Sequence, residues 1–234
     1  ITVKRLALDG LPLMISSGAI VAYAKIDIII LGYLLDFREV GIYSAAVKIS
    51  EIWYVIPMTL TTLLFPLILG SRKESPMSYR KMLRSASETM LIVCFLAVTL
   101  LFAFGPYLVK LVYQPEFHVA GEIIRILSFA GIFVGLGYVN GRYLVAENLL
   151  YLTMRRNLYG LALNVILNFV LIPLYGIHGA AISTLIAIFY TGLGCLVFSK
   201  KTHDILRIQC LAFNILAQPL RIINTLKALG GRSD

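Results

Sequence analysis

Four charged side chains lie inside long apolar stretches of this sequence. Lys25 and Asp27 fall in one stretch, and Lys48 and Glu51 fall in the next. Charged groups at membrane depth are costly, and they usually face a protein interior or a water-filled cavity. These four residues are therefore the first candidates for chemistry, either as partners of one another or as ligands for an ion or a charged substrate.

The four charges fall into two pairs, and the members of each pair lie at the same depth in the membrane. The short link DFRE makes the stretches an antiparallel hairpin, so depth can be counted from its outer end. Asp27 and Lys48 both lie about 12 Å below that end at a rise of 1.5 Å per residue, and Lys25 and Glu51 lie roughly 15 to 16 Å below it. We expect Asp27 to approach Lys48, and Lys25 to approach Glu51.

Two roles are open for such pairs. They can hold two helices together, as buried ions commonly do, or they can line a cavity that meets an anionic substrate or a coupling cation. Residues two apart on a helix point about 200° away from each other, so Lys25 and Asp27 cannot both face one cavity squarely.

Catalysis is the weaker class of function for this chain. His118, His178 and His203 are isolated, and no Cys or His pair has metal-ligand spacing. Cys94, Cys195 and Cys210 have no paired spacing either. We therefore expect a protein that is not an enzyme and that carries neither a metal nor a cofactor.

Six stretches are long enough to cross a bilayer core of roughly 30 Å as helices. The predicted spans are residues 11–35, 40–69, 88–109, 120–144, 158–175 and 177–199. Lys and Arg crowd into every second gap between these spans, and the other gaps are nearly free of them. The positive-inside bias then predicts that both termini are cytoplasmic, in a multi-pass protein of the inner membrane.

Composition supports a membrane protein: 59% of residues are hydrophobic and only 14% are charged. The net charge of +9 comes from the flanks of the spans, so the expected partners are anionic lipid headgroups and not nucleic acid. Residues 1–201 are predicted to form one all-α six-helix bundle. Residues 202–234 are predicted to form a basic tail with an interfacial helix. Because the chain opens at Ile1 directly before a basic pair, we expect a fragment of a longer protein.

The fifth span also carries amides at helical spacing, at Asn157, Asn164 and Asn168. Amides in a membrane can hydrogen-bond to a neighbouring helix, and we interpret these three as packing contacts between helices.

Two segments resemble a known family. The stretch KIDIIILGYLLDFREVGIYSAAVKISEIWYVIPMTLTTLLFP, from Lys25 to Pro66, is similar to the seventh and eighth helices of the polysaccharide-repeat-unit flippases, which are relatives of the MATE exporters. The stretch LNVILNFVLIPLYGIHGAAIST, from Leu163 to Thr184, resembles the eleventh and twelfth helices of the same family. The resemblance extends over nearly the whole chain up to Lys201.

This resemblance implies a fold of two six-helix bundles facing each other across a central cavity, with this chain as the C-terminal bundle. Family members are thought to flip an undecaprenyl-diphosphate-linked oligosaccharide to the outer leaflet by alternating access. Lys25, Lys48 and Arg142 would then offset the charge of the diphosphate, while Asp27 and Glu51 would anchor the lysines or bind a coupling ion. The implied partners are the missing N-terminal bundle, the lipid-linked substrate, and polymerases or glycosyltransferases.

Two alternatives remain open at this point. A MATE-type multidrug or cation antiporter would share the fold and would favour carboxylates and aromatic side chains in its cavity over lysines. A nontransporting scaffold for a polysaccharide synthesis complex would need no cavity at all.

Overall fold

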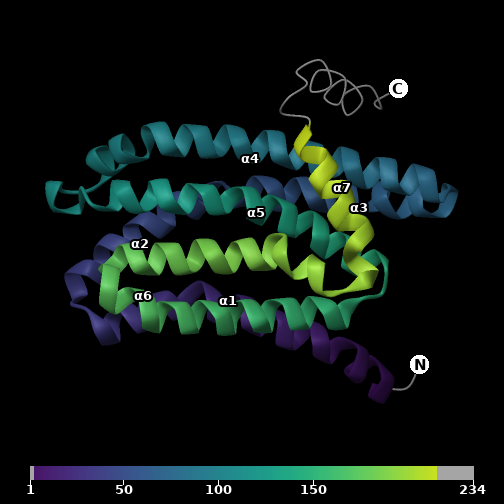
Figure 1. The fold of residues 1–234 in the computed structure, drawn as a ribbon, viewed down its shortest axis with the longest axis horizontal. Helices are drawn as coiled ribbons and strands as arrows, with labels where there is room; N and C mark the ends of the chain where they lie inside the picture. Colours follow the sequence, from purple (N-terminus) through teal and green to yellow (C-terminus); the bar gives the residue numbers. More distant parts are fainter. Residues whose placement is uncertain (1–2, 215–234) are drawn as a thin grey trace.

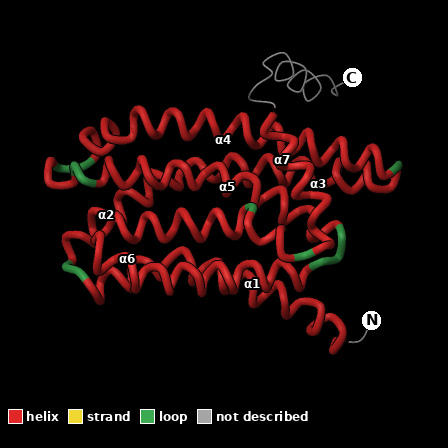
Figure 2. The backbone as a smooth tube through the Cα atoms, viewed as in Figure 1, coloured by secondary structure: helices red, strands yellow, loops and turns green. Residues whose placement is uncertain are grey.

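The computed structural model describes residues 3–214, and within that range the chain forms helices joined by short turns, with no strand (Figure 2). This confirms the all-α class. The α-helices are α1 (Val3–Leu34), α2 (Phe37–Glu51), α3 (Val55–Glu74), α4 (Pro76–Val112), α5 (Ala120–Ala146), α6 (Leu150–Gly192) and α7 (His203–Ala212). The short 3₁₀ helices are η1 (Ile52–Tyr54), η2 (Pro115–Phe117), η3 (Gly194–Phe198) and η4 (Lys200–Thr202).

Five helical stretches are long and apolar enough to cross a membrane: Ser17–Leu34, Phe37–Glu74, Pro76–Val112, Ala120–Ala146 and Leu150–Gly192. The last of these contains the fifth predicted span and most of the sixth, up to Gly192. At Gly176 the backbone leaves the helical region for a φ of 57°, a conformation that glycine adopts at no steric cost. Figure 1 shows α6 turning back on itself, so that its two limbs run in opposite directions.

Several predicted boundaries differ from the helix ends. The third predicted span is 88–109, whereas α4 begins at Pro76. The helix starts there because Ser75 accepts a hydrogen bond from the amide of Ser78 and Pro76 occupies the first turn. The second span contains a 3₁₀ segment at Ile52–Tyr54. It precedes Pro57, whose ring removes an amide donor and crowds the carbonyl four residues earlier. The sixth helix ends at Gly192 and not at Ser199, because η3 follows it.

The helix at the centre of the bundle is α5. Its spanning window is 56% buried, whereas the other four windows are between 24% and 28% buried. It packs against α4 and α6, and α2 and α3 also contact it. The outer helices present large apolar side chains such as Leu63, Leu100 and Phe104 on their exposed faces, as expected for surfaces that contact lipid.

Buried amides tie α5 to the chain that follows α6. Asn140 donates to the carbonyl of Gly192, and Gln209 on α7 donates to Asn140 Oδ1 at 2.7 Å and to the carbonyl of Leu136 at 3.2 Å. Helix α7 occupies the start of the predicted tail, and its buried face packs against α4 and α5; the interfacial position of this tail stays a prediction. The rest of the predicted tail, from residue 215 onward, lies outside the described residues.

Gly192 sits where α6 meets α5 most closely. A Cβ at this position would lie 2.3 Å from the backbone oxygen of Phe133, which cannot swing aside as a side chain can. We expect Gly192→Ala to lower the free energy of unfolding by about 1–3 kcal/mol through overpacking. The measurement is thermal unfolding of the purified protein in detergent. The matched control is Gly141→Ala on α5, where a Cβ would meet no atom within 4 Å; equal melting temperatures for the two variants would contradict this expectation.

Candidate functional site

The Asp27 carboxylate is buried inside the bundle, with 6% of the residue exposed. Three side chains from other segments donate hydrogen bonds to it. Tyr43 on α2 donates to Oδ2 at 3.0 Å, Asn168 in the first limb of α6 donates to Oδ1 at 2.6 Å, and Thr184 in the second limb donates to Oδ2. One carboxylate on α1 therefore joins α2 and both limbs of α6.

A second layer of oxygen atoms surrounds this group. Asn164 Oδ1 accepts from Asn168 at 3.2 Å, and the Thr184 hydroxyl lies 3.0 Å from the carbonyl of Ala180. Asn168 Oδ1 and Asn164 Nδ2 are buried without a hydrogen-bond partner among the described residues. The amides, hydroxyl, carbonyl and carboxylate together form an oxygen-rich set of the kind that hard cations prefer.

No positively charged side chain forms an ion pair with Asp27 among the described residues. Its partners are all neutral donors. A buried carboxylate held only by neutral groups leaves a net negative charge in a low-dielectric region. A bound proton or a small monovalent cation would offset that charge, and the donors present could then reorient their oxygens toward it.

Two adjoining cavities open beside this carboxylate. The small one, of about 20 Å³, lies next to Asp27 and has room for about one water molecule. The larger one, of about 250 Å³, extends to Arg156 and Asn157. Both cavities are lined by the same four side chains, namely Tyr23, Glu51, Tyr54 and Ile188. Glu51 is thus the second carboxylate of one polar region.

The predicted contact between Asp27 and Lys48 is wrong. Lys48 is exposed, and Tyr43 takes the place beside Asp27 that depth alone assigned to Lys48. The two side chains are five residues apart on α2, which turns Lys48 about 140° around the helix from Tyr43 at 3.6 residues per turn. Equal depth along two helices does not fix which way each side chain faces around its helix axis.

The second predicted contact does not form an ion pair. Lys25 and Glu51 are both exposed on this chain, and no ion pair within 4 Å joins them in residues 3–214. The Lys25 side chain leaves α1 on a different face from Asp27, as the 200° spacing requires.

Arg142 lies apart from the cavities beside Asp27 and Glu51. Its guanidinium donates to Thr62 Oγ1 at 2.8 Å and sits over the ring of Phe65, 5.2 Å from the centroid. Among the described residues that line these two cavities, none is Lys25, Lys48 or Arg142. The predicted contact of these three cations with substrate remains a prediction.

Sequence reasoning missed Tyr43, Thr184 and Arg156. The asparagines on α6 gave a signal through their i, i+4 spacing, and the expected hydrogen bond to a neighbouring helix is confirmed by the bond from Asn168 to Asp27. Thr184 gave none, because a single Thr hydroxyl in a helix commonly bonds to its own backbone. Tyr43 gave none, because it is one of 13 tyrosines in the sequence and nothing in its spacing marks it. Thr184 reaches Asp27 only because α6 reverses at Gly176.

Sequence comparisons show similarity to a polysaccharide biosynthesis family and to probable flippases. A family model described as "Polysaccharide biosynthesis protein" matches residues 2–72. A "probable low-salt glycan biosynthesis flippase" of Haloferax volcanii is 28% identical over 166 residues, which cover 69% of this chain and 34% of the relative. The "probable flippase AglR" of the same organism is 29% identical over 173 residues, covering 71% of this chain and 36% of the relative. The chain thus spans about a third of the length of these two relatives.

Structural comparisons identify the fold. A crystal structure of a MATE protein in a bent conformation superimposes with a TM-score of 0.66 and 18% identity, covering 92% of this chain and 53% of that one. A transporter of the MOP superfamily from Pyrococcus furiosus gives a TM-score of 0.61 and 17% identity with the same coverage. The chain has the fold of about half of such a protein. The chain is thus similar in part of its sequence to polysaccharide biosynthesis proteins and to probable flippases, and it shares the fold of half of a MATE-type protein.

Proposed function

We propose that this chain is the C-terminal bundle of a transporter that flips lipid-linked oligosaccharide repeat units across the cytoplasmic membrane for polysaccharide biosynthesis. The carrier is undecaprenyl diphosphate or a similar polyprenyl diphosphate, and both termini of the chain are cytoplasmic. The observation that carries the proposal is the buried Asp27 carboxylate, held by neutral donors beside a polar cavity within a MATE-like half.

Asp27 is the coupling site in this proposal. A proton or a small cation bound there removes the uncompensated charge and keeps α1, α2 and both limbs of α6 together. Its release leaves an anion that favours a different arrangement of those helices, so occupancy and conformation are linked. Such linkage is what alternating access between two bundles requires.

The substrate is accommodated mainly outside this chain. A cavity of about 250 Å³ is smaller than the roughly 300–1,000 Å³ of ordinary small-ligand pockets, and an oligosaccharide exceeds those ligands in size. The sugars therefore occupy the space between this bundle and an N-terminal one. Lys25 and Lys48, exposed on this chain, are available to the diphosphate in that space.

One observation favours a second candidate, a MATE-type cation antiporter. The larger cavity is lined by Glu51 together with Tyr23, Tyr54, Phe133 and Tyr138, and its described lining includes neither of the two lysines. A carboxylate among aromatic rings is suited to an organic cation. The scaffold alternative receives no comparable support from the cavity.

The coupling role predicts the behaviour of Asp27→Asn. The change keeps the side-chain size and removes the charge, so the full-length protein in vesicles should exchange labelled lipid-linked oligosaccharide at least 10-fold more slowly and should no longer respond to an imposed sodium or proton gradient. Glu116→Gln, at an exposed carboxylate on η2, is the control and should behave as wild type. Wild-type exchange no faster than in protein-free vesicles would refute flipping itself.

The substrate role predicts a different result for Lys48→Ala. Because Lys48 is exposed and makes no ion pair in the described chain, the variant should keep the wild-type melting temperature while binding lipid-linked oligosaccharide several-fold more weakly. Lys73→Ala, an exposed lysine in the last turn of α3, serves as the control. If Lys48→Ala binds the oligosaccharide as tightly as wild type, Lys48 is not part of the substrate site.

Glu51→Gln separates the two candidate functions. A flippase should lose at most part of its oligosaccharide exchange, because Glu51 is a carboxylate and does not bind the diphosphate anion. A cation antiporter should lose uptake of a fluorescent organic cation almost completely, since Glu51 is the only carboxylate among the described residues that line the larger cavity. Uptake is measured in vesicles with the full-length protein under an imposed pH gradient.

A further inference from the structure

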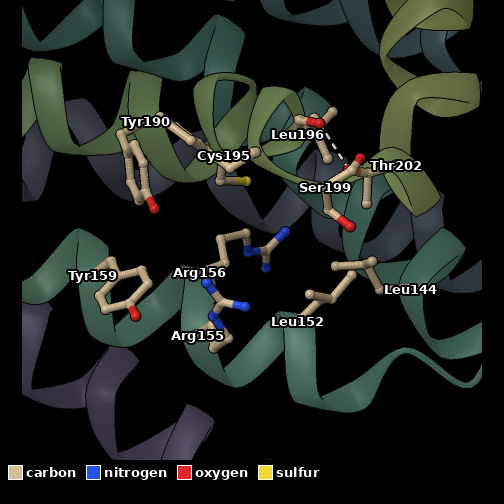
Figure 3. A pocket seen from close by; sticks show the side chains of 11 residues that line it. Leu144, Leu152, Arg155, Arg156, Tyr159, Tyr190, Cys195, Leu196, Ser199 and Thr202 are labelled. Carbon is tan, nitrogen blue, oxygen red and sulfur yellow. Dashed lines mark hydrogen bonds between the residues drawn. The ribbon is translucent and has the colours of Figure 1, made fainter.

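A separate pocket lies between the start of α6 and the segment that follows its end. Its volume is about 230 Å³, and its lining comes from α5, α6 and η3 through to Thr202. Arg155 and Arg156 project into it from the second turn of α6, facing Cys195 and Ser199 across the gap (Figure 3). Tyr159 and Tyr190 form one of its sides.

The two arginines bring uncompensated positive charge into this pocket. None of the described residues that line it is acidic, and neither guanidinium has a carboxylate partner within 4 Å in residues 3–214. Within residues 3–214, the hydrogen bonds of Arg156 are long, 3.4 Å to the carbonyl of Gly137 and 3.3 Å to Asn157 Oδ1. Arg155 lies over the rings of Tyr151 and Tyr159. Each guanidinium carries five N–H donors, so most of them are left for a ligand.

The rest of the pocket suits an amphiphilic ligand. Leu144, Leu152, Leu196 and Phe198 provide apolar walls, and Phe198 is 78% exposed at the rim. Arg155 lies about 8 Å along α6 from its first residue at 1.5 Å per residue, which places it near the end of a membrane-spanning limb. A soluble anion would gain nothing from the apolar walls, whereas a lipid would contact them with its glycerol and upper acyl carbons.

We propose that this pocket binds the phosphate headgroup of an anionic membrane phospholipid. Two adjacent guanidiniums can hold phosphate oxygens with charge-assisted hydrogen bonds. The positive charge of a choline headgroup would repel the two guanidiniums and weaken this binding. Basic pockets between helices at a bundle end are typical sites for anionic lipid headgroups. This site is independent of the transported substrate and does not rest on the proposed function.

Arg156 also gives the site a connection to the bundle interior. Its side chain lines both this pocket and the larger cavity that contains Glu51. A phosphate bound by Arg156 would therefore place a negative charge at the edge of that cavity.

Lipid binding to the purified full-length protein tests the proposal. Native mass spectrometry in a neutral detergent would follow titration with phosphatidylglycerol and, separately, with phosphatidylcholine. We expect phosphatidylglycerol to bind preferentially, and Arg155→Gln/Arg156→Gln to weaken that binding at least 10-fold. The matched control is Lys200→Gln/Lys201→Gln, which removes the same charge from two exposed neighbouring lysines outside the pocket lining. Equal weakening by both double variants would overturn the proposal.

Two further measurements address folding and the identity of the lipid. Arg155→Lys/Arg156→Lys keeps the charge and should restore part of the binding, and the melting temperature of each variant shows whether it is folded. Inorganic diphosphate and a polyprenyl diphosphate are then used as competitors. Displacement of phosphatidylglycerol by polyprenyl diphosphate at more than 10-fold lower concentration would assign the pocket to the carrier and overturn the phospholipid assignment. Retained lipid binding in a protein that flips nothing would refute only the proposed function.

Discussion

A carboxylate buried without an opposite charge organises the middle of this bundle. Asp27 on α1 is satisfied by a tyrosine from α2 and by an amide and a hydroxyl from the two limbs of α6. Each of these donors is neutral, so the hydrogen bonds orient the groups but leave the charge in place. The same carboxylate thus contacts α2 and both limbs of α6, so a proton or cation bound there in the proposed transporter would act on three segments.

The reversal in α6 makes this arrangement possible. Gly176 adopts a positive φ, which brings Thr184 back alongside Asn168 after a turn of the chain. The first limb supplies the amides, and the second supplies the hydroxyl together with the carbonyl of Ala180. Further along the same two limbs, Arg156 and Tyr190 meet in the basic pocket. Two of the partners of Asp27 and the two arginines of the pocket thus lie on one helical hairpin, and Arg156 also lines the larger cavity.

Charge separation along this cavity distinguishes the bundle from a simple packed core. Carboxylates occupy the Asp27 and Glu51 positions, and Arg156 closes the other end. The lysines expected in the cavity lie instead on exposed faces of α1 and α2. In the proposed transporter, an anionic substrate would meet the bundle surface and the interior would take a cation or a proton. The coupling and substrate sites would then be separate.

The sequence by itself determined the helices, their apolar lengths and the presence of charges at depth, because hydropathy and helical rise are properties of consecutive residues. It also indicated the family through the segments around Asp27 and Asn168. The partners of Asp27 were decided only by the tertiary structure. Depth can be counted along a chain, but the rotation of Lys48 away from Tyr43, and the return of Thr184 after Gly176, depend on how helices pack against one another. Such contacts join residues more than a hundred positions apart, and no spacing in the sequence records them.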